Sequence, residues 1–127
     1  MKKWILFLLA ALLLTGCGKE KSDKEAVYVN ITAQEAKEIM DTQEGYIILD
    51  TRAQDEYDEG HIPGAIVIPH DEIEEKAPKM LTDKDQLILV YCRSGRRSKI
   101  AAEALVKLGY TNIKEFGGII DWPYEVE

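Results

Sequence analysis

A five-residue apolar run that ends in a cysteine constrains the fold of this 127-residue chain more than any other feature. The run Leu87–Tyr91 leads into Cys92, a loop with one glycine and three arginines follows, and a helix is expected over Ser98–Leu108. A short run without polar residues is typical of a central parallel strand, which is buried on both faces. Open α/β sheets bind their ligands at the carboxyl ends of such strands. Cys92 is therefore expected at the functional edge of a parallel sheet.

Strand and helix patterns alternate along the chain from about residue 26 onward. Besides the strand before Cys92, these patterns predict strands at Tyr28–Ile31, Tyr46–Asp50, Ile66–Ile68 and Ile113–Phe116. They predict a helix that begins after the capping-box residue Thr32, one over Gln54–Glu59, and one over Asp71–Lys76 that Pro78 breaks. This alternation predicts an α/β fold, with a small, mostly parallel five-stranded sheet flanked by helices on both faces.

The N-terminal residues have the composition of a targeting segment. Lys2 and Lys3 give a basic start, and Trp4–Leu14 is an unbroken apolar run of eleven residues. A helix needs roughly 20 residues to span a bilayer, so the run is typical of a secretory signal peptide. The following Leu14-Thr15-Gly16-Cys17 resembles the lipobox of bacterial lipoproteins, in which the cysteine is diacylated and becomes the mature N-terminus. The alternative is an ordinary signal peptide or membrane anchor that carries a cysteine.

The sequence therefore predicts three segments: a lipoprotein signal peptide over 1–16, a polar tether over 17–25, and one domain over 26–127. Two or more acyl chains on Cys17 would anchor the protein stably in the membrane, on its extracytoplasmic face. That face is the extracellular side or the periplasm, according to the host.

The chain is acidic, with 16 basic and 23 acidic residues and a net charge of −7. Loss of Lys2 and Lys3 with the signal peptide leaves 14 basic against 23 acidic residues, a balance of −9. Such a surface argues against nucleic acid or anionic lipid as a partner. The arginines that follow Cys92 therefore stand out as a local positive cluster.

Cys92 has no cysteine partner once Cys17 carries lipid. Structural cysteines in an extracytoplasmic compartment normally come in pairs, so a single one is either a reactive thiol or a buried inert one. Its position before a helix and among arginines favours the thiolate, which is the nucleophilic form. A Cys17–Cys92 disulfide is the alternative if Cys17 is not acylated.

Three separated blocks resemble the single-domain rhodanese family. The first block is Leu49-Asp50-Thr51-Arg52, Glu56-Tyr57 and Gly60-His61-Ile62-Pro63-Gly64-Ala65, ending at Ile68-Pro69. The second is Tyr91-Cys92-Arg93-Ser94-Gly95-Arg96-Arg97-Ser98, and the third is Gly109-Tyr110, Phe116-Gly117-Gly118-Ile119 and Trp122. The order of the three blocks makes the resemblance specific, and it covers the chain from about Val27 to its end.

The resemblance implies sulfur transfer. Cys92 would attack the outer sulfur of thiosulfate or another sulfane donor, hold that sulfur as a persulfide, and pass it to cyanide or a thiol, such as a thioredoxin-like protein. The loop N–H groups and the helix start would face the thiolate, and one or two of the arginines would lie at the loop mouth. The substrate-binding residues implied in this way are Arg93, Ser94, Gly95, Arg96, Arg97 and Ser98. The implied protein is a monomer without a cofactor, and the scattered His61, His70 and Cys92 do not have metal-ligand spacing.

Four further residues of the first block are expected to support the site structurally. Asp50 would accept loop N–H bonds or pair with Arg52. Arg52 and Glu56 are four positions apart and would form an ion pair that braces the short helix. His61 lies in a stiff turn before Pro63 and is expected to be a hydrogen-bonded structural histidine rather than a base.

Two other functions compete with sulfur transfer. Many rhodanese-like domains lack the cysteine and bind partner proteins, but the retained Cys92 and its arginine-rich loop favour an enzyme. Cysteine phosphatases and arsenate reductase-like relatives use Cys-x5-Arg, whereas the sixth position after Cys92 is Ser98, with Arg96 and Arg97 at the fourth and fifth. The shorter loop is expected to accommodate one sulfur atom.

Overall fold

The computed structural model describes residues 27–127, so Cys17 and the predicted signal peptide and tether lie outside the described residues. Its elements in chain order are β1 (Val29–Asn30), α2 (Ala33–Thr42), β2 (Ile47–Asp50), α3 (Gln54–Glu59), β3 (Ile66–Val67), the 3-10 turn η3 (His70–Glu72), α4 (Ile73–Met80), β4 (Ile88–Cys92), α5 (Arg96–Lys107), β5 (Ile113–Gly118) and the 3-10 turn η4 (Ile119–Asp121). Within residues 27–127 no helix combines the length and the apolar character that crossing a membrane requires.

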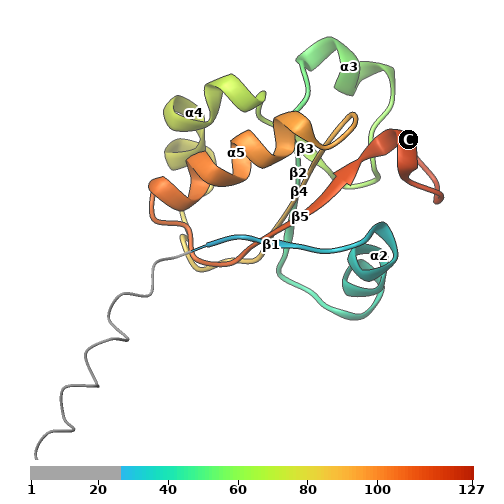
Figure 1. The fold of residues 1–127 in the computed structure, drawn as a ribbon, viewed down its shortest axis with the longest axis horizontal. Coiled ribbons are helices and arrows are strands. Elements are labelled where there is room, and N and C mark those ends of the chain that lie inside the picture. Colours follow the sequence, from blue (N-terminus) through green and yellow to red (C-terminus); the bar gives the residue numbers. More distant parts are fainter. Residues whose placement is uncertain (1–26) are drawn as a thin grey trace, which may run out of the picture.

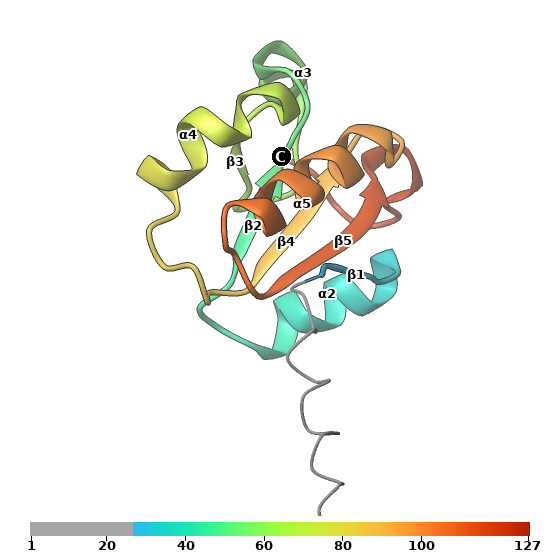
Figure 2. The ribbon, with the colours of Figure 1, turned by 60° about the vertical axis from the view of Figure 1, so that its left-hand side comes forward.

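The five strands form one parallel sheet in the order β1-β5-β4-β2-β3. Helices α4 and α5 cover one face and α2 covers the other, as Figures 1 and 2 show. Strand β4 is central and fully buried, and its side chains alternate between the two cores. Val90 packs in the core beneath α4 and α5, whereas Leu89 and Tyr91 pack in the core beneath α2. The predicted α/β fold with a five-stranded sheet is confirmed.

The sequence patterns identify the elements better than their ends. Helix α3 has the predicted bounds, but α5 begins at Arg96 rather than Ser98. The prediction that Pro78 breaks the preceding helix is wrong, because α4 continues through it to Met80. Ala77 is fully buried, and the Tyr110 hydroxyl donates to its carbonyl at 3.0 Å, which holds this turn in place. A proline removes only one backbone donor, and tertiary packing compensates for that loss here.

The carboxyl ends of β2, β4 and β5 meet at one edge of the sheet. The β4–β5 register shifts between Val90 and Cys92, so that Cys92 lies opposite Gly118. Register shifts of this kind are characteristic of bulges, which locally bend a strand and occur next to active sites. The parallel topology therefore brings Asp50, Cys92 and the start of α5 together at the edge where such sheets bind ligands.

Candidate active site

Cys92 is buried at the end of β4, where the backbone turns into α5. The residue is 1% exposed, and the Gly95 N–H donates to Sγ at 3.0 Å. Gly95 has a φ of +108°, in the left-handed region that favours glycine, and it precedes the first residue of α5. The Ser98 hydroxyl oxygen, from the first turn of that helix, lies 3.4 Å from Sγ. The loop thus folds around the sulfur and directs hydrogen-bonding groups at it.

This environment changes the acidity of the thiol. Burial alone raises the pKa of Cys92, because it disfavours the charged form. The interaction with the Ser98 side chain, together with hydrogen bonds from the Ser98, Gly95 and Ser94 N–H groups, outweighs burial and lowers the pKa below its ordinary value. The hydrogen bonds around the buried sulfur therefore favour the thiolate, which is the nucleophilic form of cysteine.

Gly118 lets the loop approach β5 closely. A Cβ atom at this position would collide with the Arg93 carbonyl and with Cα of Ser94. The same carbonyl accepts a hydrogen bond from the Ile120 N–H at 3.2 Å, so the loop is tied to the turn after β5. The Gly117-Gly118 pair is visible in the sequence. Only the tertiary fold shows that the missing side chain at Gly118 leaves room for the Cys92 loop.

Arg97 joins the loop to α3 through Glu56. Its guanidinium donates to the two carboxylate oxygens of Glu56 at 2.8 and 3.0 Å, and both side chains are largely buried. The predicted Arg52–Glu56 pair is therefore wrong. The helical spacing of four would join these two residues only if both lay in α3, but Arg52 precedes the helix and turns toward Asp50.

Asp50 is the centre of a buried polar network beneath the loop. It is fully buried, and it accepts hydrogen bonds from the Arg52 N–H at 2.9 Å, from the Arg52 guanidinium at 2.6 Å and from the Tyr91 hydroxyl at 2.6 Å. The Tyr91 oxygen in turn accepts from the Ile62 N–H at 3.1 Å. The predicted pairing of Asp50 with Arg52 is confirmed, and the network joins β2, β4 and the turn before β3.

His61 contacts Tyr57 and Glu127 rather than the Cys92 loop. Its ring stacks on Tyr57 with centroids 3.8 Å apart, and Nδ1 lies 2.9 Å from the Tyr57 carbonyl oxygen. Its backbone exchanges two hydrogen bonds with Glu127, at 2.9 and 2.8 Å. These contacts fasten the chain end to the turn that follows α3.

Of the other loop arginines, Arg93 and Arg96 are exposed. Arg93 lines a surface cavity of about 430 Å³ together with Arg52, Glu56 and Trp122. Within residues 27–127 no group of three or more His, Cys, Asp or Glu side chains could hold a metal ion. The guanidinium groups of Arg93 and Arg96 lie near the loop, and a guanidinium forms charge-assisted hydrogen bonds with anions.

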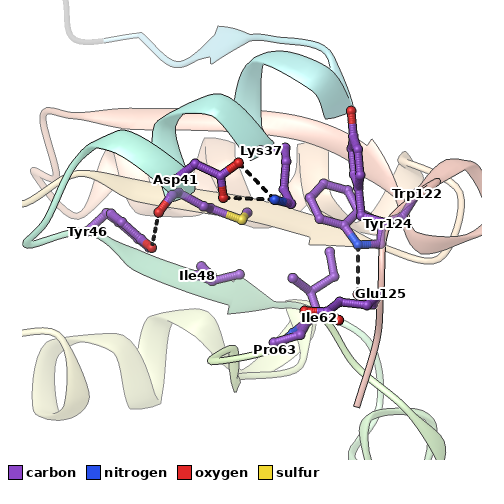
Figure 3. Close-up of a pocket in the computed structure, with 10 residues that line it drawn as sticks. Lys37, Asp41, Tyr46, Ile48, Ile62, Pro63, Trp122, Tyr124 and Glu125 are labelled. Atoms are coloured by element: carbon purple, nitrogen blue, oxygen red, sulfur yellow. Dashed lines mark hydrogen bonds and ion pairs between the residues drawn. The ribbon is translucent and has the colours of Figure 1, made fainter.

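A second cavity, of about 200 Å³, lies under α2 and is separate from the Cys92 loop (Figure 3). Four of its polar side chains are paired within the protein. Lys37 and Asp41 form an ion pair at 2.8 Å, the Tyr46 hydroxyl donates to the Met40 carbonyl at 3.0 Å, and the Trp122 ring N–H donates to a carbonyl at 3.1 Å. None of these groups points to chemistry, so the Cys92 loop is the candidate site.

Glu115 is a site residue that the sequence interpretation missed. It lies on β5, is 2% exposed, and accepts a hydrogen bond from the Ser98 hydroxyl. One signal could have identified it, because Glu115 is an acidic residue inside an otherwise mostly apolar strand pattern next to Phe116. A buried charged group is rare unless it is paired or functional.

The Glu56–Arg97 pair predicts an acid-dependent stability. The hydrogen bond from Arg97 lowers the pKa of Glu56 from 4.5 to about 2, so the pair stabilises the fold above pH 4.5 and loses this effect as the pH falls toward 2. Glu56→Gln should lower the free energy of unfolding by about 1–2 kcal/mol at pH 7. Near pH 2, urea unfolding should give Glu56→Gln and the wild type about the same free energy of unfolding. The control is Glu103→Gln, at an exposed position, which should match the wild type at both pH values. An equal deficit at both pH values would contradict the assignment.

Comparison with known proteins identifies the family to which this cysteine loop belongs. Residues 32–123 match the rhodanese-like domain family, and the chain belongs to it. Residues 1–17 match the prokaryotic membrane lipoprotein lipid attachment site, in agreement with the lipobox. The resemblance to the rhodanese family and the resemblance to a lipobox are thereby both confirmed.

Individual relatives are moderately similar. The thiosulfate sulfurtransferase PspE of Escherichia coli is 38% identical over 73 residues, which are 58% of this chain and 70% of the relative. The putative sulfur carrier protein YrkF of Bacillus subtilis is 34% identical over 111 residues, and the match covers 87% of this chain but only 59% of that protein. Among solved structures, a rhodanese-related protein from Thermoplasma volcanium has a TM-score of 0.68 at 35% identity, covering 79% of this chain and 98% of its own.

Proposed function

We propose that this domain is a sulfurtransferase that takes a sulfane sulfur from thiosulfate or a similar donor. The Cys92 thiolate attacks the outer sulfur, a bond from Sγ to that sulfur forms, and the sulfur–sulfur bond of thiosulfate breaks. Sulfite leaves with the electron pair, and a persulfide remains on Cys92. One observation carries the proposal: the buried Sγ is surrounded by the Gly95 N–H and the Ser98 hydroxyl, which lower the pKa of the thiol.

The loop is suited to hold a persulfide. Backbone N–H groups and the start of α5 supply fixed partial positive charge where the outer sulfur becomes anionic. Ser94 and Gly95 provide such N–H groups beside Cys92. The names of PspE and YrkF, one a thiosulfate sulfurtransferase and the other a putative sulfur carrier, support the same chemistry.

An acceptor then removes the sulfur in a second displacement, which makes the mechanism ping-pong. Cyanide or a thiol, including that of a thioredoxin-like protein, has the required nucleophile. Initial rates with thiosulfate and cyanide should give parallel lines in double-reciprocal plots. Intersecting lines would mean that both substrates bind together, and they would contradict a persulfide intermediate.

The competing functions find less support at the site. A phosphatase or arsenate reductase of the Cys-x5-Arg type needs a guanidinium at position 98, where Ser98 instead contacts Sγ and Glu115. A domain that only binds a partner protein needs no acidic thiol, whereas the loop here lowers the pKa of Cys92. We therefore propose sulfur transfer over both alternatives. We further propose that the protein acts as a monomer, and that its net negative charge makes nucleic acid an unsuitable partner.

The loop arginines are proposed to attract the anionic donor. Arg93→Ala, Arg96→Ala and Arg97→Ala should each lower kcat/KM for thiosulfate by roughly tenfold to a hundredfold. Alkylation of Cys92 by neutral iodoacetamide should change much less, because the loop N–H groups that favour the thiolate remain. Thiosulfate kinetics and alkylation rates measured on each variant check this expectation. Wild-type thiosulfate kinetics in all three variants would assign selectivity to the loop backbone alone.

We further propose that residues 1–16 are removed, that Cys17 carries the lipid, and that residues 17–25 tether the domain 26–127 to the extracytoplasmic face of the membrane. Cys17→Ala should then leave the chain uncleaved or released from the membrane, because no acyl chain can be attached. Membrane fractionation and the mass of the N-terminal peptide check this. Cleavage of the wild type at another site, without lipid, would instead indicate a plain secretory signal.

A further inference from the structure

Glu115 is a buried carboxyl group behind the Cys92 loop, and the proposed sulfur transfer does not explain it. Its Oε2 accepts hydrogen bonds from the Ser98 hydroxyl at 2.5 Å and from the Gly117 N–H at 3.0 Å. Its Oε1 lies 3.4 Å from Nζ of Lys99, which is half exposed. Removal of a carboxylate from water is costly, and a cavity-filling apolar residue would serve β5 without this cost.

Ser98 connects this carboxyl group to the reactive sulfur. Its Oγ lies 3.4 Å from Sγ of Cys92 on one side and 2.5 Å from Oε2 of Glu115 on the other. A serine hydroxyl has one proton to donate and two lone pairs that accept. When Ser98 donates to Glu115, its lone pairs are free to accept the thiol proton. The three groups therefore form a continuous path for a proton from the sulfur to the carboxylate.

We propose that Glu115 holds the proton of the Cys92 thiol when the thiolate forms, and that the Ser98 hydroxyl passes it on. The S–H bond of Cys92 breaks as a new O–H bond forms on Ser98, and the original O–H bond of Ser98 breaks as one forms on Glu115. No electrons are gained or lost, and the net charge of the site does not change. Afterwards Glu115 donates to Ser98, and Ser98 donates to the thiolate beside the Gly95 N–H, so every group keeps a partner.

Charged groups from α5 face both members of the pair. Glu115 faces the Ser98 hydroxyl and the cation of Lys99 on α5, and the Gly117 N–H of its own strand. The charge of Arg97, also on α5, acts on Cys92. Lys114, the neighbouring residue on β5, alternates to the other face of the strand. Because Glu115 acts on the sulfur only through Ser98, it is a positioning residue. The inference rests on the proposed function only in taking Cys92 as the reactive thiol.

The test is the pH dependence of alkylation at Cys92 in the full-length chain, measured with iodoacetamide on the peptide that contains Cys92. A thiol and a carboxylate that share one proton titrate in two macroscopic steps. The wild-type rate should therefore rise with pH in two steps separated by a shallow region. A single-step curve for the wild type would overturn the proposal, and this measurement needs no variant.

Glu115→Gln identifies the second group of the pair. An amide holds no transferable proton and no negative charge, so its profile should show one step. Between the two wild-type steps the variant should react faster, on the order of tenfold, because its thiol no longer shares one proton with a carboxylate, a sharing that leaves only a fraction of the wild-type sulfur ionised. Lys99→Gln is the matched control, and it should keep both steps. Two steps in Glu115→Gln would exclude Glu115. Sulfite release from thiosulfate, measured alongside, reports separately on sulfur transfer.

Discussion

Replacement of Cys92 by serine should abolish sulfur transfer from thiosulfate to cyanide while the domain remains folded. A serine hydroxyl provides no anion at neutral pH and forms no persulfide, so the expected loss is on the order of 10³-fold or more in kcat. The fold should persist because the smaller hydroxyl can still accept the Gly95 N–H that now contacts Sγ. Thiocyanate formation measures the activity, and thermal unfolding measures the fold.

Cys17 provides the matched control for this experiment. It lies far outside the block of sequence that forms the active-site loop, and Cys17→Ser should retain the thiosulfate kinetics of the wild type. Substantial turnover by Cys92→Ser would exclude Cys92 as the nucleophile. Loss of turnover in Cys17→Ser would show that the N-terminal cysteine takes part in the reaction.

The largest loss of stability is expected from Asp50→Asn. Asp50 is fully buried and neutralises the guanidinium of Arg52, which is 6% exposed. Without the carboxylate charge, the buried Arg52 cation loses the carboxylate that pairs with it, and the Tyr91 hydroxyl loses its charged acceptor. The free energy of unfolding should fall by about 3–5 kcal/mol.

Urea unfolding at pH 7 measures this loss. The matched control is Glu103→Gln, which also exchanges an acid for its amide but at an exposed position of α5, and it should change stability by less than about 0.5 kcal/mol. A loss below about 1 kcal/mol in Asp50→Asn would show that Arg52 is solvated in the folded domain, in conflict with the buried network.

The sheet could be predicted from the sequence because its pattern is local. The apolar residues of β4 and the capping residues before α2 specify their elements without reference to the rest of the chain. The position of Cys92 at the functional edge follows from the topology of any parallel sheet, and the structure places it there. Pro78 shows the limit of such patterns, since packing around Ala77 lets α4 continue past a residue that usually ends helices.

The contacts of the candidate site could be predicted only in part. Asp50 and Arg52 are two residues apart, and their pairing follows from a local turn. Glu56 pairs with Arg97, 41 positions away, because α3 and the start of α5 meet at one edge of the sheet. Glu115 reaches the site through the β4–β5 pairing, and no local spacing indicates its contact with Ser98. The sequence therefore identifies the chemistry of Cys92, whereas the partners that support it require the fold.

The central claim is that Cys92 carries a sulfur atom during the reaction. The intact mass of the full-length chain should increase by one sulfur atom after incubation with thiosulfate, and peptide analysis should locate this sulfur on Cys92. The added mass should disappear when cyanide is supplied, and it should not form in Cys92→Ser. An unchanged mass after thiosulfate, or an added sulfur on another residue, would contradict the persulfide mechanism.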